Sequence, residues 1–446
     1  MKINNNNSAA QSKNAHVVII GAGFGGLWAA RAFAGKNIDV TIIDKNNYHT
    51  FLALLYQVAA AELEAEQIAY PIRSIFRKQK NADFILSYAQ KIDYQKKIIK
   101  TDGGIIHYDY LIMAAGSVTE TFDIKGVEEN AFFLKTLEQA IALKNHIICC
   151  FEAAAHEKEE TRRRELMTFV IVGGGATGIE YAGALAELIH GPLIKDYRNI
   201  KLQDVQIILL EAADKLAANM PQSVRDYTLR RLAEMGVQVR LNTKVQEVTL
   251  SKVILQDQIE ILSATVVWTA GVRGEPLAQL SDIKTGRNGR IAVRATLQTE
   301  EYPDVYVIGD LAAISDDNRA LPMVAQVAMQ SGVAAAQNIL RQIARQPLEP
   351  FRYHDRGSMI TIGRKAAGVA IGKRTFQGFF AWVIWLVIHL FNLIGFRNRI
   401  MVLINWAWDY LLYERAVRFI FPSCTSSFSP ASYCSRSSDA CKKIIK

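Results

Sequence analysis

The stretch that decides the fold is HVVIIGAGFGGLWAARAFAGKNIDVTIID, residues 16–44. A short β-branched run (16–20) stops at the glycine-rich turn GAGFGG (21–26), a helical pattern follows, and a second β-branched run ends in Asp44. Strand, glycine turn, helix, strand and acid in this order are typical of a βαβ unit that binds a dinucleotide, with the pyrophosphate at the helix N-terminus.

The same arrangement recurs in the middle of the chain. Residues 168–172 form a strand-like run, GGGATG (173–178) is the turn, a helical pattern follows, and the run 205–210 leads to Glu211. The distance from Gly173 to Glu211 exceeds the usual spacing of about 20 residues, which predicts an insertion around residues 190–204. Two such units predict two dinucleotide sites, or one site and a decayed copy.

Each glycine of such a turn has its own physical role. The first allows the tight turn, the second lets the backbone approach a pyrophosphate, and the third lets the helix pack closely on the strand. These roles fall on Gly21, Gly23 and Gly26, with Phe24 and Gly25 completing the turn, and on Gly173, Gly175 and Gly178.

The acids at the strand ends indicate which nucleotide is used. Asp44 and Glu211 can accept hydrogen bonds from a ribose 2′-hydroxyl. Glu211 is followed by Ala212 and Ala213, where a reader of a 2′-phosphate would place an arginine. The second unit is therefore expected to prefer NADH to NADPH.

Composition and charge limit the number of domains and the kind of partner. A chain of 446 residues, half of them hydrophobic, is long enough for two or three domains. From Arg352 onward there are 14 Lys and Arg against four Asp and Glu, so the net charge of +9 resides in the C-terminal quarter. Basic residues beside an apolar segment favour an anionic membrane surface over nucleic acid as the partner. The alternative is a solvated charged face.

The duplicated units resemble the two-dinucleotide-binding-domain flavoproteins over about residues 16–372. In that family the first unit holds FAD and the second NAD(P)H. The resemblance implies that Gly309 and Asp310 in VYVIGDLA (305–312) contact the FAD ribityl chain and that Gly116 in AAGS (114–117) lies at the flavin. A helix N-cap role for Asp310 is compatible with this.

Four longer strings resemble one subfamily, the type II, non-proton-pumping NADH:quinone oxidoreductases, over about residues 16–420. The strings are NYHTFLALLYQVA (47–59), VVWTAGVRG (266–274), LPMVAQVAMQSG (321–332) and FRNRIMVLINWAWDYLLYERAVRFI (396–420). Ala53 stands where that family commonly has proline. The resemblance implies non-covalent FAD, NADH, a membrane quinone, a homodimer, and a peripheral place on the cytoplasmic face of the bacterial inner membrane.

The resemblance also carries site residues over. The family's AQxxxQ quinone motif falls on Ala325, Gln326 and Gln330, although two glutamines on a helix are, read alone, usually surface residues. Glu180, expected in the first helical turn, is implied to lie between nicotinamide and flavin, with complementation of the helix dipole as the structural alternative. Lys45, His49 and Lys373 are implied contacts to FAD or the quinone entrance.

The cysteines separate this branch from its neighbours. Disulfide reductases carry a CxxxxC pair soon after the first glycine turn, whereas the first cysteine here is Cys149. Adjacent Cys149 and Cys150 look like ordinary buried residues rather than the separated pair of a sulfide:quinone reductase. No metal site is expected. A soluble ferredoxin or rubredoxin reductase and a membrane-bound NADH-sensing flavoprotein remain as alternative functions.

The C-terminal quarter contains the segment FFAWVIWLVIHLFNLIGF (379–396), 18 residues without a formal charge. Its Trp382, Trp385, His389, Asn392 and Phe396 recur at helical spacing, which predicts a polar and aromatic stripe at the membrane interface. Two interfacial helices are favoured over a transmembrane hairpin, with a dimer interface or packed core as the third alternative. The basic residues expected to bind lipid headgroups are Lys373, Arg374, Arg397, Arg399, Arg415 and Arg418.

The predicted fold is thus α/β, with two Rossmann-like dinucleotide-binding domains and a C-terminal amphipathic membrane-anchoring region. Its expected parts are a flexible leader (1–14), an FAD-binding domain in two pieces (15–125 and 285–372), an NADH-binding domain (126–284), membrane-anchoring helices (373–420) and a disordered tail (421–446).

Overall fold

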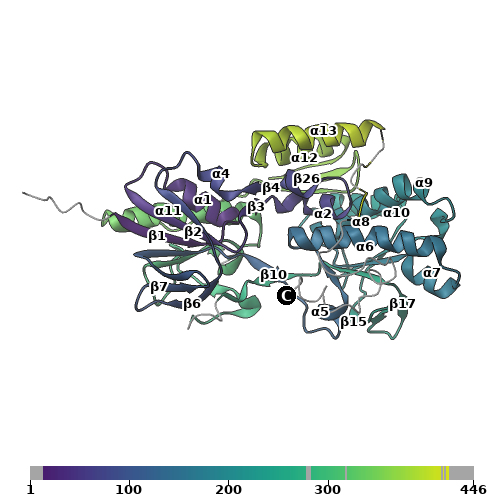
Figure 1. Cartoon of the computed structure of the whole chain (residues 1–446), viewed down its shortest axis with the longest axis horizontal. Helices are drawn as coiled ribbons and strands as arrows, with labels where there is room; N and C mark the ends of the chain where they lie inside the picture. The colour runs from purple at the N-terminus through teal and green to yellow at the C-terminus, as the bar shows by residue number, and fades with distance from the viewer. Residues whose placement is uncertain (1–13, 278–282, 317–318, 413–414, 416–417, 421–446) are drawn as a thin grey trace, which may run out of the picture. The chain divides into compact units, whose positions relative to one another are not determined.

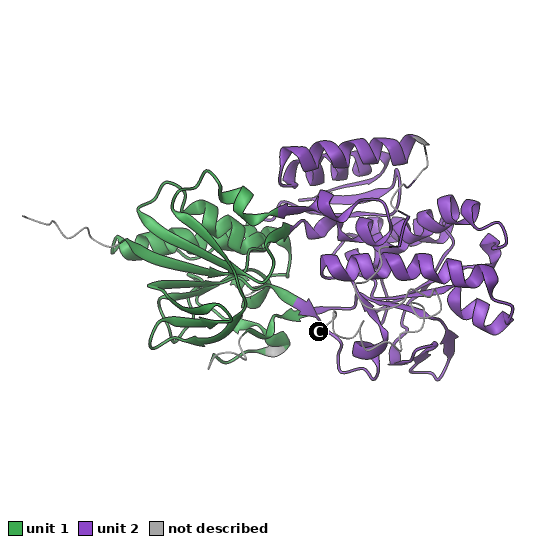
Figure 2. Ribbon diagram, viewed as in Figure 1, with its two compact units in different colours: residues 1–49, 71–117, 273–354 green, residues 50–70, 118–272, 355–446 purple. Residues whose placement is uncertain are grey.

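The computed structural model describes residues 14–277, 283–316, 319–412, 415 and 418–420. The expected leader, apart from Asn14, and the expected tail lie outside the described residues. The chain forms two compact units, coloured separately in Figure 2. Unit 1 comprises residues 1–49, 71–117 and 273–354, and unit 2 comprises residues 50–70, 118–272 and 355–446.

A five-stranded parallel sheet forms the centre of unit 1. Its strand order is β21-β9-β1-β2-β5, with bounds Val305–Val307, Tyr110–Met113, Ala15–Ile20, Ile38–Asp44 and Ala82–Leu86. Val17, Val18 and Ile19 of the central strand are completely buried. Burial on both faces explains why this strand reads as a continuous β-branched run rather than an alternating one.

Helices and smaller sheets complete unit 1 (Figure 1). The helices are α1 (Phe24–Ala32), α4 (Ile72–Phe76) and α11 (Ala325–Ile343), with 3-10 turns η5 (Arg287–Gly289) and η6 (Gly309–Leu311). An antiparallel sheet contains β6 (Ala89–Asp93), β7 (Ile98–Thr101) and β8 (Gly104–His107). Two short pairs are β20 (Ile291–Ala292) with β22 (Ala312–Ala313), and β23 (Ser315–Asp316) with β24 (Arg319–Ala320).

Unit 2 contains a second five-stranded parallel sheet. Its order is β11-β18-β12-β13-β14, with bounds Phe132–Phe133, Thr265–Trp268, Thr168–Val172, Gln206–Leu210 and Val237–Arg240. An antiparallel sheet of β15 (Val245–Val248), β16 (Lys252–Leu255) and β17 (Glu260–Leu262) shares a buried apolar core with it.

The helices of unit 2 are more numerous than those of unit 1. They are η1 (Leu52–Leu54), α2 (Leu55–Ala59), α3 (Ala65–Ile68), α5 (Val127–Asn130), α6 (Leu137–His156), α7 (Glu160–Leu166), α8 (Ala176–Leu188), α9 (Ile194–Asp196), η3 (Leu202–Asp204) and α10 (Gln222–Glu234). A π-helical turn, η2 (Ile189–Leu193), follows α8 and contains Pro192, which has no N–H to continue the α-helical ladder. Together with α9 and η3 it occupies the predicted insertion.

The C-terminal part of unit 2 contains a hairpin sheet and two helices. The sheet consists of β25 (Ser358–Thr361), β26 (Ala367–Ile371) and β27 (Arg374–Gly378), and the helices are α12 (Phe379–Asn392) and α13 (Phe396–Leu412). Four short strands, β3 (Tyr48–Thr50), β4 (Ala69–Pro71), β10 (Ser117–Thr119) and β19 (Val272–Gly274), stand where the chain passes between units. Residues 50–70 and 355–372, which were expected in the FAD-binding domain, belong to unit 2. The functional domain bounds stay predictions.

Candidate dinucleotide and quinone sites

The first glycine turn has the geometry that a pyrophosphate site needs. Gly21 has φ of +102°, and a Cβ there would lie 2.4 Å from the carbonyl oxygen of Ala114. A Cβ on Gly26 would lie 1.8 Å from the carbonyl oxygen of Gly21, so α1 packs backbone to backbone against the turn. A Cβ on Gly23, in contrast, would meet no described atom within 4 Å. The open space beside the helix N-terminus fits a phosphate group.

Asp44 braces this turn. Its carboxylate accepts hydrogen bonds from the backbone N–H groups of Ala22 (2.7 Å) and Asn46 (2.8 Å). Burial raises its pKa, while these two donors and nearby Lys45 act in the opposite direction. Since a carboxylate has about four lone-pair sites, the two bonds leave capacity for a ribose hydroxyl. The ribose role of Asp44 stays a prediction.

Close helix packing joins the turn to the predicted quinone motif. A Cβ on Gly332 of α11 would lie 2.3 Å from the carbonyl oxygen of Gly25 in α1. A Cβ on Gly25 would in turn lie 3.3 Å from the carbonyl oxygen of Ala328. The two helices therefore contact through their backbones, and Figure 1 shows α1 beside α11. This packing fixes the N-terminus of α11, where Ala325 and Gln326 stand, relative to the glycine turn.

A hydrogen bond links the other two segments expected at the flavin. The Ser117 hydroxyl donates to the Asp310 carboxylate over 2.5 Å, although 193 residues separate them in sequence. Gly309 has φ of +63° and its N–H donates to the Ser331 hydroxyl of α11 (3.1 Å). Gly116 has φ of +77°, with no described atom within 4 Å of a Cβ position. These bonds bring Gly309, Asp310, Ser117 and α11 together in unit 1, and their contacts with flavin stay predictions.

The Gln330 side chain is hydrogen-bonded to the backbone of His354. The side-chain amide of Gln330 donates to the carbonyl of His354 (2.9 Å) and accepts from the N–H of His354 (3.0 Å). Gln330 therefore holds the chain segment at His354, and both ends of its amide are already engaged. A direct contact of Gln330 with quinone stays a prediction, since the amide nitrogen has a second N–H and the amide oxygen a second lone pair. Gln326 stands one turn earlier, in the first turn of the helix.

Three cationic or imidazole residues were also expected near FAD. His49 is buried and bonded through Nδ1 to the carbonyl of Ala22 (2.9 Å), and burial lowers its pKa. Its buried Nε2 makes no hydrogen bond to any described residue. Lys45 is exposed after β2, and Lys373 is exposed in the β26–β27 turn of unit 2. A neutral His49 with an unpaired nitrogen fits a polar cofactor group.

The second glycine turn repeats the first closely. Gly173 has φ of +113°, and a Cβ on Gly178 would lie 1.9 Å from the Gly173 carbonyl oxygen. Gly175 has no described atom within 4 Å of its Cβ position. The Glu211 carboxylate accepts from the N–H groups of Gly174 (2.6 Å) and Ala213 (2.7 Å). This matches the arrangement at Asp44, so the second turn is an intact nucleotide cradle rather than a decayed copy.

Glu180 does not lie in the first turn of its helix. α8 begins at Ala176, which makes Glu180 the fifth helical residue, so the expected position was wrong. The helix dipole acts mainly over the first turn, and that structural alternative falls away. Burial raises the Glu180 pKa to about 8, although the Thr361 N–H donates to it (3.3 Å) and the Trp385 indole also favours the charged form. At neutral pH the carboxyl is mostly protonated.

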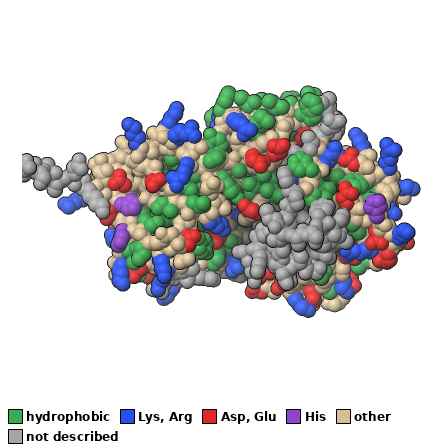
Figure 3. Space-filling view, in the orientation of Figure 1, with side chains coloured by type: hydrophobic (Ala, Val, Ile, Leu, Met, Phe, Trp, Pro, Cys, Tyr) green, Lys and Arg blue, Asp and Glu red, His purple; other side chains and the backbone are tan. Residues whose placement is uncertain are grey.

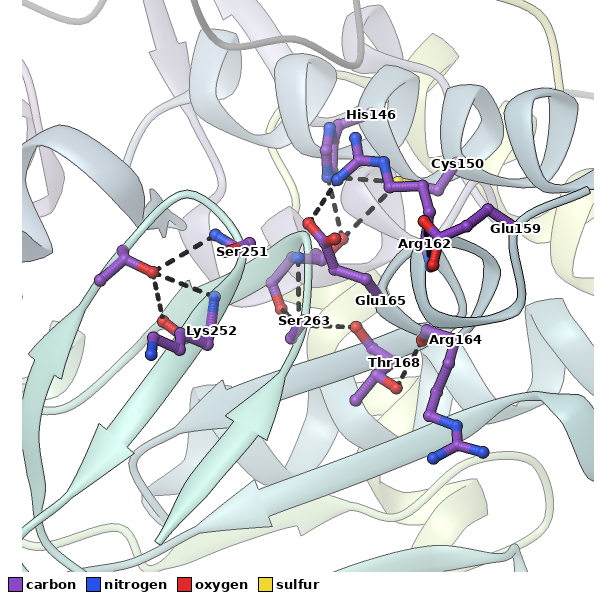
Figure 4. A network of polar contacts seen from close by, with 12 residues as sticks. His146, Cys150, Glu159, Arg162, Arg164, Glu165, Thr168, Ser251, Lys252 and Ser263 are labelled. Carbon is purple, nitrogen blue, oxygen red and sulfur yellow. Dashed lines mark hydrogen bonds and ion pairs between the residues drawn. The ribbon is translucent and has the colours of Figure 1, made fainter. Parts of the chain in front are cut away.

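Among the described residues, Cys149 and Cys150 are not joined in a disulfide bond. Both thiols are buried on α6. Figure 4 shows Cys150 and His146 in a polar network. The Cys150 sulfur lies 3.4 Å from His146 Nε2, which lies 2.9 Å from the Thr265 hydroxyl. These contacts tie α6 to β18 of the parallel sheet. The cysteines therefore have a packing role, as the sequence indicated.

The two C-terminal helices expose an apolar face, but not the predicted one. Trp382 and Trp385 are buried in unit 2 with 7% and 1% of their surface exposed, so the interfacial stripe through them was wrong. Figure 3 shows hydrophobic side chains gathered over α12 and α13. The exposed apolar residues, hereafter the apolar face, are Phe379, Phe380, Val383, Val387, Phe391, Phe396, Ile400, Leu403, Ile404, Trp408 and Leu411.

Polar contacts fasten the opposite side of these helices to unit 2. The Trp406 indole donates to Gln57 (3.0 Å), and the Asn398 amide donates to the carbonyls of Gln67 (3.0 Å) and Ala69 (3.0 Å). Arg415 is buried, which corrects its expected role in binding headgroups. Among the described residues, no helix is both long and apolar enough to cross a bilayer.

Two glycine turns of this kind, each opening a helix beside a parallel sheet, define a flavoprotein of the pyridine nucleotide-disulphide oxidoreductase class. The model of that family matches residues 15–332. The chain is 37% identical to a type II NADH:quinone oxidoreductase of Mycobacterium tuberculosis, over 91% of this chain and 90% of the relative. It belongs to the type II NADH:quinone oxidoreductase family, which confirms the resemblance.

Other relatives and structures agree with this assignment. A probable NADH dehydrogenase of Dictyostelium discoideum is 32% identical over 88% of this chain and 89% of the relative. The solved NDH2 of Plasmodium falciparum in complex with NADH has the same fold, with a TM-score of 0.84 at 19% identity, covering 92% of this chain and 100% of that one. The sulfide:quinone oxidoreductase of Aquifex aeolicus is less similar, with a TM-score of 0.71, 21% identity and coverage of 86% and 92%.

The sequence interpretation missed several residues of the site. Three of them are hydrogen-bonded to expected residues: Ser117 to Asp310, Ser331 to Gly309 and Thr361 to Glu180. A single serine or threonine has no distinctive sequence spacing by which it could have been predicted. Glu187 also escaped notice, although it stands seven residues after Glu180 and a spacing of two helical turns places both on one face. That spacing was the available signal.

Proposed function

We propose that the protein oxidises NADH through non-covalently bound FAD and reduces a membrane quinone without pumping protons. The observation that carries this proposal is the presence of two intact nucleotide cradles in a chain 37% identical, over 91% of its length, to a type II NADH:quinone oxidoreductase. FAD, when bound, accepts the hydride and passes the electrons to quinone. The protein supplies binding, orientation and exclusion of water.

The residues of unit 1 would hold FAD. The N–H groups at the start of α1, freed by Gly21, Gly23 and Gly26, would bind the pyrophosphate, and Asp44 the ribose. Asp310, positioned by Ser117, would bind the ribityl chain, and Ala325 and Gln326 would flank the flavin ring. Lys45, His49 and Lys373 are proposed to contact FAD or the quinone entrance.

The residues of unit 2 would hold NADH. Gly173, Gly175 and Gly178 open the start of α8 to the pyrophosphate, and Glu211 would accept from the ribose hydroxyl. Glu180 presents a mostly protonated carboxyl on the same helix, where an O–H group can donate a hydrogen bond. We propose that this carboxyl lies beside the nicotinamide.

The apolar face is proposed to rest in the bilayer interface as a monotopic anchor. Contiguous apolar surface of this extent marks an interaction site on a soluble body. Exposed Lys373, Arg374 and Arg397 belong to the same unit and would attract anionic headgroups. Attachment to the cytoplasmic face of a bacterial inner membrane and assembly as a homodimer stay predictions.

The cofactor and acceptor can be tested together on the purified holoenzyme. We expect NADH to be used with at least tenfold higher kcat/KM than NADPH, because the Glu211 carboxylate repels a 2′-phosphate and Ala212 and Ala213 offer no cation. Turnover should be rapid with a short-chain quinone and slow with ferredoxin or rubredoxin. A long-lived reduced complex that quinone does not reoxidise would instead support the sensor alternative.

Substitution of the two glutamines tests the quinone side. Gln326→Ala should slow flavin reoxidation by quinone at least tenfold, while leaving FAD content and reduction by NADH nearly unchanged. Gln330→Ala should slow reoxidation too and, because it frees the segment at His354, should also lower thermal stability. Stopped-flow measurement separates the two half-reactions. If Gln326→Ala slows the reduction of the flavin by NADH and not its reoxidation by quinone, Gln326 serves the NADH site instead.

A further inference from the structure

Arg415 is a buried arginine whose ion pairs join distant parts of unit 2. Its guanidinium contacts the carboxylates of Glu62 (2.5 Å) and Glu187 (3.2 Å). It also donates to the carbonyls of Ala60 (2.8 Å) and Ala184 (3.0 Å). Its side chain is 3% exposed, and the bonds span up to 355 residues of sequence. Five donors in a planar fork make arginine suited to such multiple bonding.

Glu187 transmits the position of Arg415 to the turn that follows β25. The backbone N–H of Arg364 donates to one Glu187 oxygen, and the Arg364 guanidinium lies 3.5 Å from the other, which also faces Arg415. A Cβ on Gly183 of α8 would lie 2.9 Å from the N atom of Gly363, so this turn contacts the helix backbone directly. The turn has little freedom to move while Glu187 is held.

The same turn begins at the residue that binds Glu180. Thr361 donates its N–H to Glu180, and its hydroxyl donates to the carbonyls of Gly363 (3.1 Å) and Ala366 (3.2 Å). Glu180 and Glu187 are two turns apart on one face of α8. The two carboxylates therefore grip the two ends of one turn, Glu180 at Thr361 and Glu187 at Arg364.

We infer that Arg415 is a positioning residue for Glu180, acting through Glu187 and the Thr361–Arg364 turn. Without the guanidinium, Glu62 and Glu187 are left facing each other without their shared cation. Glu187 then turns away or takes a proton, the turn loosens, and the Thr361 N–H no longer supports the charged form of Glu180. The inference rests on the proposed role of Glu180 for its effect on turnover, but not for its effect on the carboxyl itself.

Other ionisable groups face this pair of sites. Around Glu180 this is the Tyr56 hydroxyl on α2. Around Arg415 they are Arg364 and, on α13, Asp409 and Tyr410. Burial raises the pKa of Glu62 to about 7 and that of Asp409 to about 6, with Arg415 acting in the opposite direction in both. Loss of Arg415 therefore favours the protonated forms of Glu62 and Asp409.

The test is a titration of the Glu180 carboxyl in the holoenzyme by infrared difference spectroscopy, with the band assigned by its absence in Glu180→Gln. Arg415→Gln should raise the titration midpoint by about one pH unit, the size of a lost hydrogen bond to the charged form. Arg415→Lys should raise the midpoint by less than Arg415→Gln does. Arg418→Gln breaks the ion pair with Asp196 and the hydrogen bond to the Arg415 carbonyl, but it leaves the contacts of the Arg415 guanidinium in place. It should leave the midpoint unchanged.

Stopped-flow reduction by NADH over the same pH range supplies the second readout. If the midpoint shifts but the rate does not follow it, Arg415 positions Glu180 and the proposed role of Glu180 is wrong. An unchanged midpoint in Arg415→Gln, whatever happens to stability, overturns the inference. Should Arg415→Gln fail to fold, Glu187→Ala replaces it, because alanine removes both the contact with Arg415 and the acceptor of the Arg364 N–H. The Glu180 midpoint should rise in this variant, and an unchanged midpoint overturns the inference.

Discussion

Gly178→Ala is expected to abolish measurable NADH binding and to destabilise unit 2, while leaving the FAD spectrum in place. The added methyl would lie 1.9 Å from the Gly173 carbonyl oxygen and 2.8 Å from the Thr269 hydroxyl, so helix α8 must move away from its strand. Overpacking of this kind costs about 1–3 kcal/mol or more, which lowers Tm by at least about 3 °C. Calorimetry and NADH titration measure the two effects.

Gly175→Ala is the matched control for that experiment. Its methyl would meet no described atom within 4 Å, so the fold and its stability should be unchanged. The methyl nevertheless enters the space where the pyrophosphate is expected, and KM for NADH should rise at least tenfold. If Gly175→Ala binds NADH normally, the open space beside α8 is not the phosphate site, and the assignment of the second cradle fails.

Removing the apolar face is expected to release the protein from membranes. Phe380, Val387, Phe391, Leu403, Trp408 and Leu411 are between 52% and 77% exposed. Transfer of each into the interface contributes roughly 1 kcal/mol, so replacing all six with serine should weaken vesicle binding by about 10⁴-fold. Cosedimentation with vesicles that contain anionic lipid measures this. Turnover of a short soluble quinone should persist.

The control for this variant uses apolar residues that are equally exposed elsewhere. Ile105, Leu250 and Ile259 are between 50% and 61% exposed on small antiparallel sheets, and serine there should leave vesicle binding unchanged. A sixfold variant that stays on the vesicles would show that the apolar face binds something other than lipid. Substitution is a sharper test than truncation, because deletion of α13 and Arg415 would also leave Gln57, Glu62 and Glu187 without their partners.

The two nucleotide cradles could be predicted from sequence because their geometry is local. Gly21 and Gly173 need a positive φ, Gly26 and Gly178 need the absence of a Cβ, and the acids follow at the end of the next strand. All of these demands act within one βαβ unit of about 30 to 40 residues. A single stretch of sequence therefore contains both the glycines and acid and the turn that they form. The strings that resemble the family then added the expected function to this predicted fold.

The orientation of the C-terminal helices could not be predicted in this way. α12 is apolar on nearly every side, so Trp382 and Phe380 offer equally good candidates for the exposed face. Only the partners in unit 2 decide between them: the Tyr56 ring packs edge-on against Trp385, and Gln57 accepts from Trp406 of α13. Helical period shows which residues share a face, but not which face meets the rest of the protein.

The sequence by itself therefore determined the two parallel βαβ units, the pairing of each glycine turn with its acid, and the basic, apolar character of the C-terminal quarter. Only the tertiary structure decided that the Gln330 amide is hydrogen-bonded to the backbone of His354 and that Arg415 is buried. It also decided that Glu180 and Glu187 bind the two ends of the same Thr361–Arg364 turn. Steric limits on backbone angles act between neighbours in sequence, whereas burial and ion pairing depend on which distant segment folds against a side chain. For Arg415 those segments are 353 and 228 residues away.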